Sequence, residues 1–158
     1  MSQLHVLGIG SPFGDDQLGW DVVKQLQKKS SLSRFTDEQI HLSYSDRPGL
    51  YLLELMRHAQ YVFLIDAIKT GAPIGTCLCF HNEAIEDIND TLSSHSLGIA
   101  AAMTMGRTLK ILPKHIVLYA IEIGDIVYDN AVSPPIKQAI NHLMQQIEED
   151  ITNIFLPK

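Results

Sequence analysis

Apolar and polar residues alternate along the chain in a way that predicts strands and helices in turn. Apolar runs with the length and near-continuity of buried parallel strands lie at residues 3–9, 39–44, 61–68, 75–80 and 115–123. Segments with helical spacing or helix-boundary residues lie between and after them, at 16–29, 49–59 and 133–151. A further helix, capped by Ser93 or Ser94, is predicted to run through residues 97–109. This alternation predicts an α/β fold, a three-layer sandwich whose mostly parallel twisted sheet of about five strands has helices on both faces.

Local residues support the ends of the first and last helices. The first helix begins with acidic residues and ends at Lys28-Lys29, and both ends suit the helix dipole. The last helix opens with Ser133 and the Pro134-Pro135 pair. Its apolar stripe consists of Ile136, Ile140, Leu143, Ile147 and Ile151. Since no repeat, low-complexity tract or linker divides the chain, we expect a single domain over residues 1–158.

Composition narrows the class of protein. The chain has 158 residues, of which 46% are hydrophobic and 19% charged, as in ordinary globular proteins. Its formal net charge is −6 and it has no long basic run, so we expect neither nucleic acid nor a membrane as a partner. Cys77 and Cys79 would share one face of a strand, where neighbouring cysteines rarely form a disulfide. With no signal peptide recognised, these features predict a reduced, cytoplasmic protein.

The expected fold places ligands beyond the carboxyl ends of the strands, close to residues 9–16, 66–72 and 122–130. The first of these segments belongs to the glycine-rich loop GIGSPFGDDQLG. Phe13 replaces the third glycine of a dinucleotide fingerprint, and the Lys and Ser/Thr of a P-loop are missing. Asp15 and Asp16 would also repel a phosphate, so a nucleotide is disfavoured. Either the two aspartates cap the following helix, or Asp16 faces the cleft.

Two more residues stand near the same edge. Asp66 follows the apolar run YVFLI, where a buried carboxylate needs hydrogen-bond donors, a cation or a metal. The alternative role is an N-cap or a brace to the KTGAP turn that follows. His95 stands in the first turn of a predicted helix, whose dipole favours a neutral, metal-binding imidazole. With Asp16 they would form an O, O, N ligand set suited to a divalent transition metal. Glu122, at the end of the last strand, is either a further cleft carboxylate or a loop charge.

Taken together, these segments resemble the hydrogenase maturation endopeptidase family. Its members carry a G-x-G-N-x-L-x-x-D-D/E-x-x-G loop after the first strand, an aspartate ending an apolar strand, and a histidine before a short apolar segment. The matching segments here are residues 8–19, Leu64-Ile65-Asp66-Ala67 and Ser94-His95-Ser96-Leu97-Gly98, and the resemblance covers nearly the whole chain. The loop is one residue shorter than the family pattern and has Ser11 for the usual Asn. The segment SDRPGL, residues 45–50, stands where the family often has D-G-G-T-x-G.

This resemblance implies an endopeptidase that removes a C-terminal extension from the large-subunit precursor of a nickel–iron hydrogenase. It implies that Asp16, Asp66 and His95 are the catalytic-site residues, and that they bind nickel presented by the precursor. The departure at residues 45–50 implies a different substrate selection. The alternative is a non-catalytic, nickel-dependent binding or assembly-chaperone module on the same fold.

Overall fold

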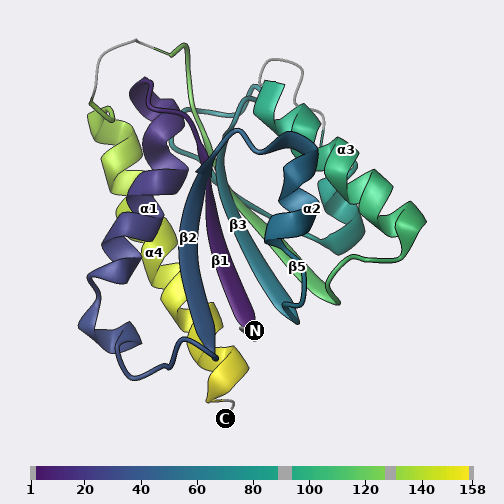
Figure 1. The fold of residues 1–158 in the computed structure, drawn as a ribbon. Helices are drawn as coiled ribbons and strands as arrows, with labels where there is room; N and C mark the ends of the chain where they lie inside the picture. Colours follow the sequence, from purple (N-terminus) through teal and green to yellow (C-terminus); the bar gives the residue numbers. More distant parts are fainter. Residues whose placement is uncertain (1–2, 89–93, 127–130, 157–158) are drawn as a thin grey trace.

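The computed structural model describes residues 3–88, 94–126 and 131–156, without the side chains of residues 94–97. Within these residues a five-stranded sheet forms the middle layer (Figure 1). Its strands are β1 (Leu4–Gly10), β2 (Ile40–Asp46), β3 (Tyr61–Ile68), β4 (Cys77–His81) and β5 (His115–Glu122), in the order β2-β1-β3-β5-β4. Every neighbouring pair is parallel except β4 and β5. The prediction of a mostly parallel sheet is confirmed.

Helices cover both faces of this sheet. α1 (Leu18–Gln27) and α4 (Pro134–Phe155) lie on one face, and α2 (Leu52–Leu55) and α3 (Ser94–Leu109) lie on the other (Figure 1). Because side chains alternate along each strand, the sheet contributes to two apolar cores. Phe63 and Ile65 of β3 pack in the core that contains α1 and α4 residues, whereas Leu64 and Ile68 pack in the core with α2 and α3.

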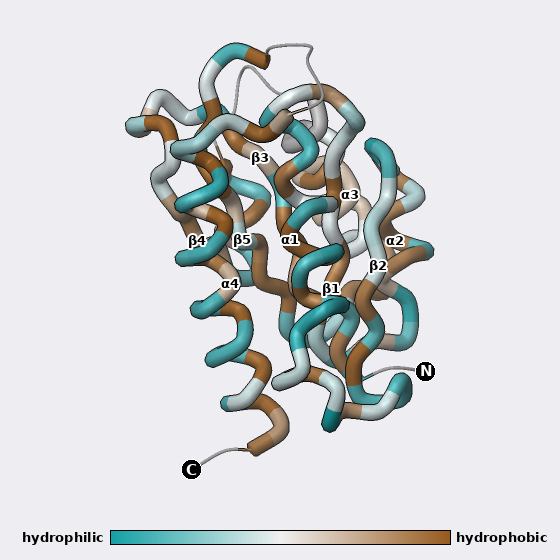
Figure 2. The backbone as a smooth tube through the Cα atoms, turned by 90° about the vertical axis from the view of Figure 1, so that its left-hand side faces the viewer, coloured by the Kyte–Doolittle hydropathy of each residue, from teal (hydrophilic) through white to brown (hydrophobic). Residues whose placement is uncertain are grey.

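The C-terminal helix α4 shows how one buried stripe attaches a helix to the sheet. Hydrophobic and hydrophilic residues alternate along it in Figure 2. All members of the predicted stripe are buried, namely Ile136, Ile140, Leu143, Ile147 and Ile151. In the described part of the chain, no helix is both long enough and apolar enough to cross a membrane.

Two predicted elements differ from the observed ones. The segment predicted as a helix over 49–59 forms a 3-10 turn at Gly49–Tyr51 and then α2, which ends at Leu55. The left-handed backbone at His58, with φ 68°, is incompatible with a helix continuing to residue 59. The strand predicted at 75–80 is β4, and it runs antiparallel to β5. Its connection from β3 is too short to hold the crossover that a parallel strand requires.

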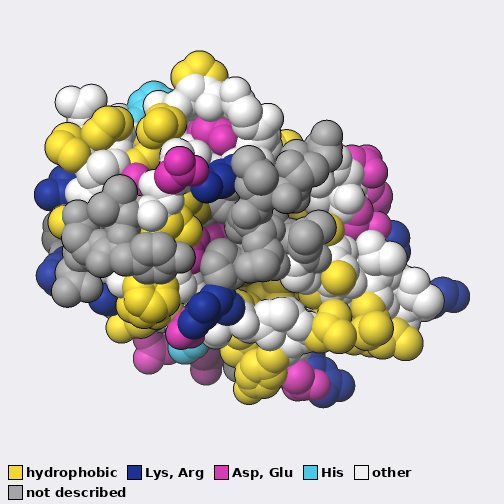
Figure 3. Space-filling model, turned by 90° about the horizontal axis from the view of Figure 1, so that it is seen from above, with side chains coloured by type: hydrophobic (Ala, Val, Ile, Leu, Met, Phe, Trp, Pro, Cys, Tyr) yellow, Lys and Arg dark blue, Asp and Glu magenta, His cyan; other side chains and the backbone are white. Residues whose placement is uncertain are grey.

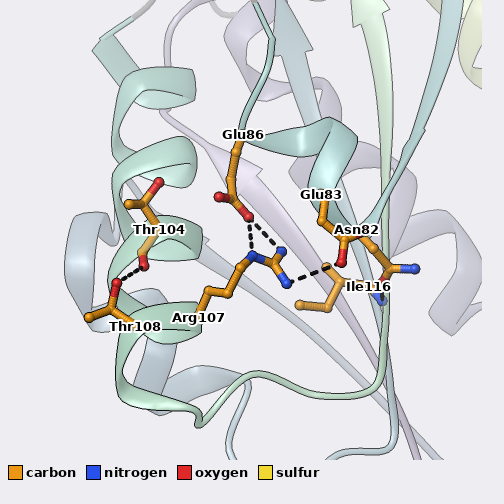
Figure 4. Close-up of polar contacts among 7 residues, drawn as sticks. All are labelled: Asn82, Glu83, Glu86, Thr104, Arg107, Thr108 and Ile116. Carbon is orange, nitrogen blue, oxygen red and sulfur yellow. Dashed lines mark hydrogen bonds and ion pairs between the residues drawn. The ribbon is translucent and has the colours of Figure 1, made fainter.

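A partly exposed polar cluster fastens α3 to the rest of its layer (Figure 4). Arg107 of α3 donates through Nε to Oε1 of Glu86 at 2.7 Å and through Nη1 to Oε1 of Glu83 at 3.3 Å. Glu83 belongs to the 3-10 turn η4 (Asn82–Ile85). The Asn82 side chain in turn accepts a hydrogen bond from the backbone N–H of Ile116 in β5, at 2.9 Å. The cluster therefore ties α3, which contains His95, to the sheet.

Candidate active site

The glycine-rich loop after β1 is packed against the protein's own backbone. A Cβ at Gly8 would lie 2.2 Å from the carbonyl oxygen of Gly19, and a Cβ at Gly10 would lie 2.3 Å from that of Asp16. Both glycines are thus needed so that the loop and the first turn of α1 can approach β1.

Asp16 lies in the 3-10 turn η1 (Gly14–Gln17), and only 2% of it is exposed. The Ser11 hydroxyl donates a hydrogen bond to Oδ2 of Asp16, and the Asp16 backbone N–H donates to the carbonyl of Phe13 at 3.0 Å. Neither η1 nor α1 has a side-chain cap hydrogen bond. The N-cap residues are Phe13 and Gln17, so neither aspartate occupies the N-cap position of its own helix. Ser11, the residue in place of the family's usual Asn, orients the Asp16 carboxylate.

Asp15 makes a different connection. Its carboxylate accepts the backbone N–H of Ser133 at 2.7 Å and the Ser133 hydroxyl at 2.9 Å. Ser133 is the N-cap residue of α4, so Asp15 lies at the positive end of that helix dipole. This carboxylate therefore fixes the loop between β1 and α1 to the start of α4. The two adjacent aspartates therefore differ in their contacts: Asp15 bonds to the start of α4, and Asp16 bonds to Ser11.

Asp66 lies near the end of β3 and is 1% exposed. One carboxylate oxygen accepts the backbone N–H of Ala67 at 2.8 Å. Asp66 alternates with Leu64 and Ile68, whose side chains pack in the core containing α3 residues, so it is on the face of the sheet toward that helix. The turn η1 contacts β3. The fold therefore brings the segment that carries Asp16 next to the strand that carries Asp66.

His95 is the second residue of α3, in the first turn of the helix as predicted. Its side chain lies outside the described residues. Among the side chains that are described, no group of three or more His, Cys, Asp or Glu residues could hold a metal ion. Figure 3 looks down on the carboxyl edge of the sheet, where several acidic side chains are visible.

Glu122 provides the brace that the sequence suggested as an alternative role for Asp66. Its buried carboxylate accepts the backbone N–H of Thr70 at 2.8 Å, the Thr70 hydroxyl at 2.6 Å and the backbone N–H of Gly71 at 3.3 Å. These bonds engage both carboxylate oxygens and hold the loop that follows β3. Of the two roles left open for Glu122, the structure supports the loop charge.

Arg47 is a residue of this edge that sequence reasoning missed. Its backbone N–H donates to the carbonyl of Gly10 at 3.1 Å, and its Nε donates to Oδ1 of Asp46 at 2.7 Å. The hydrogen bond that Arg47 donates to Asp46, the charge of Asp46 and the charge of Asp16 raise the pKa of Arg47. The available signal was the departure of SDRPGL from a glycine-rich family segment. Arg47 keeps the left-handed backbone that favours glycine, with φ 41°.

The fold and the arrangement of this edge agree with the family comparison. The family described as hydrogenase maturation protease matches residues 21–150, and the chain belongs to this family. The matched range contains Asp66 and His95 and begins after Asp16.

Similar proteins carry related names. The chain is 25% identical over 153 residues to the hydrogenase expression/formation protein HupD of Thiocapsa roseopersicina. The match covers 93% of this chain and 66% of that protein, so the chain spans slightly less than two thirds of the length of this relative.

Two solved structures show the same fold. The hydrogenase maturating endopeptidase HybD from Escherichia coli superposes with a TM-score of 0.86 at 19% identity, over 97% of this chain and 94% of that one. The [NiFe] hydrogenase maturation protease HycI from Thermococcus kodakarensis KOD1 superposes with a TM-score of 0.67 at 20% identity, over 96% and 93% of the two chains.

Proposed function

We propose that this protein is the endopeptidase that removes a C-terminal extension from the large-subunit precursor of a nickel–iron hydrogenase. Asp16, Asp66 and His95 bind the nickel that the precursor presents. One observation carries the proposal: in a chain of the hydrogenase maturation protease family, Asp16 and Asp66 are almost completely buried at one edge of the sheet.

The burial of these carboxylates supports a cation as their ligand. Removing a carboxylate from water is costly unless hydrogen bonds or a positive charge compensate it. Carboxylate oxygens and an imidazole nitrogen together suit a divalent transition metal. The Ser11 hydroxyl bond to Asp16 and the Ala67 N–H bond to Asp66 limit the rotation of both carboxylates, which preorganises them for an incoming metal.

Nickel at this place offers three kinds of chemistry. It polarises a nearby carbonyl, lowers the pKa of a bound water, or positions the precursor so that the bond to be cleaved enters the site. The protein's own residues bind and orient the precursor in all three cases, and the buried edge limits the access of water.

The direct test measures the intact mass of a precursor. The purified protein is incubated with a nickel-loaded large-subunit precursor from the same organism, and with the same precursor prepared without nickel. We expect the loaded precursor alone to lose one C-terminal peptide. If every large-subunit precursor encoded by that organism keeps its mass, the proposal is wrong.

Three variants test the site. Asp16→Asn, Asp66→Asn and His95→Ala are compared with wild type for precursor cleavage and for nickel-dependent association with the precursor. We expect all three variants to lose cleavage while their circular dichroism spectra stay native. Wild-type cleavage rates in all three folded variants would refute the site assignment. Nickel-dependent association of wild type with a precursor whose mass never changes would instead indicate the non-catalytic binding or assembly-chaperone role.

A further inference from the structure

A small cavity lies on the α3 side of the sheet. Its volume is about 120 Å³, and its walls are formed by residues of β1, α2, α3 and the segment after β2. The lining residues are Ile9, Arg47, Pro48, Gly49, Leu52, Gly98 and Ile99. Ile9, Leu52 and Ile99 are buried members of one apolar core, so the walls that they form are apolar. The glycines leave the walls without side chains at two positions.

The strand register places this cavity next to the proposed site. Gly8 of β1 pairs with Ile65 of β3, so Ile9 and Asp66 are the next residues of two adjacent parallel strands. Both residues are on the sheet face toward α3. On the opposite side of the cavity, Ile99 follows His95 by one turn of α3. A peptide with its cleaved bond at Asp66 would therefore pass over the cavity.

Arg47 closes one side of the cavity. Its backbone is held by the N–H bond to Gly10, and its guanidinium is held by Asp46. The Arg47 side chain is half-exposed, at 51%, although the residue lines the cavity. A non-glycine residue at φ 41° is conformationally costly, and such conformations are concentrated at functional sites.

We propose that this cavity is a specificity subsite that accepts one aliphatic side chain of the precursor, from a residue close to the bond that is cleaved. The inference rests on the proposed function and adds the chemical class of the side chain and the residues that select it. An apolar cavity of about 150 Å³ holds benzene, so a volume near 120 Å³ suits an aliphatic side chain better than an aromatic one. Gly98 sets the depth of the subsite, and Arg47 sets its width.

Gly98 allows a test in which the fold is not endangered. A Cβ at Gly98 would meet only the Cα of Gly49, at an ordinary contact distance of 3.5 Å. Gly98→Ala and Gly98→Val therefore add volume inside the cavity, and both remove a glycine from a helix. Ala101→Val is the matched control, since Ala101 is exposed on the same helix and does not line the cavity.

The experiment measures KM and kcat for cleavage of the nickel-loaded precursor. We expect Gly98→Val to raise KM about tenfold with kcat nearly unchanged, because the loss of one methylene-sized contact changes discrimination by roughly this factor. Gly98→Ala should have a smaller effect, and Ala101→Val should match wild type. The same measurement is made with precursors that carry single alanine substitutions beside the cleaved bond. For the precursor that lacks the aliphatic side chain, Gly98→Val should cause no further rise in KM.

A second variant tests the width of the subsite. Arg47→Gly suits the left-handed backbone at this position and removes the Arg47 side chain from the wall of the cavity. When the aliphatic residue of the precursor is replaced by Phe, we expect KM to rise less with the Arg47→Gly variant than with wild type. Wild-type cleavage with an unchanged KM in Gly98→Val overturns the subsite alone. A precursor that wild type leaves intact overturns the proposed function, and the subsite falls with it.

Discussion

Two regions of the described residues bring titratable side chains together, and they differ in how deeply these side chains are buried. The first is the carboxyl edge of the sheet, with Asp16, Asp66 and Glu122, each no more than 2% exposed. The second is a trough between β4, β5 and α4, with a volume of about 560 Å³. Its titratable lining residues include Cys77, Cys79, His81, His115, His142 and Asp150. The proposed site lies at Asp16 and Asp66 of the first region, and not in the larger cavity.

The origin of the side chains explains this difference. In the trough the polar side chains come from regular elements. The Tyr119 hydroxyl, for example, donates a hydrogen bond to Oδ2 of Asp150 at 2.6 Å and so joins a strand directly to a helix. At the carboxyl edge Asp16 comes from the turn after β1, and Asp66 and Glu122 come from the carboxyl-terminal parts of β3 and β5. Segments that end at one edge of a parallel sheet can supply ligands from distant parts of the sequence. The trough exists because α4 leaves part of an edge strand uncovered.

The largest expected effect separates two carboxylates of the same edge. Asp66→Asn should lower precursor cleavage by at least about 100-fold, because it removes a proposed nickel ligand. Glu122→Gln, the matched control, should lose about 2 kcal/mol of stability by weakening charge-assisted bonds to Thr70 and Gly71. Its cleavage rate per folded molecule should stay close to wild type. Equal losses of cleavage in the two variants would contradict the distinction between ligand and brace.

The next effect concerns pH and the opposite end of β1. Burial, followed by the charge of His41, lowers the pKa of His5 to about 4 from 6.5. Between these values the unfolded chain binds more protons than the folded one, so folding stability falls as the pH falls. This one group should cost about 3 kcal/mol between pH 6.5 and pH 4. Urea unfolding of wild type and of His5→Gln, which lacks the titrating ring, measures the difference, and identical pH profiles would count against it.

A smaller effect is expected in the trough. Burial and the hydrogen bond to Asp150 raise the pKa of Tyr119, so its hydroxyl remains protonated and donates. Tyr119→Phe should destabilise the fold by about 1.5 kcal/mol, since a bond to a charged acceptor is lost. Precursor cleavage at a temperature where both proteins are folded should not change. A large loss of cleavage would show that the trough takes part in the reaction.

The smallest effect should be a gain in stability at the end of α3 away from His95. The backbone N–H groups of Lys110 and Ile111 donate to the carbonyls of Arg107 and Gly106, which is the Schellman pattern. Lys110 has φ 60°, a conformation that favours glycine. Lys110→Gly should therefore raise the free energy of unfolding by about 1 kcal/mol and leave cleavage unchanged. Thermal unfolding measures this gain, and a lower melting temperature would refute it.

Much of the fold could be predicted from local sequence. The apolar runs at 3–9, 61–68 and 115–123 specify buried strands, because a strand covered on both faces is apolar at nearly every position. The stripe from Ile136 to Ile151 specifies a helix through its period. The same patterns indicated Asp66 as a charge at the end of a buried strand, and Asp16 as a second carboxylate with no phosphate to bind.

The partners of the polar side chains could not be predicted in this way. Asp15 bonds to Ser133 across 118 residues of sequence, and Glu122 bonds to Thr70 across 52. Hydrophobic periodicity states which face of an element is buried, and it does not state which loop lies opposite. Only the packed sheet decided that Asp15 holds α4 and that Glu122 braces the loop after β3. The sequence alone determined the elements and the candidate carboxylates, since these depend on neighbouring residues; the tertiary structure decided their partners, since these depend on which distant backbones come together.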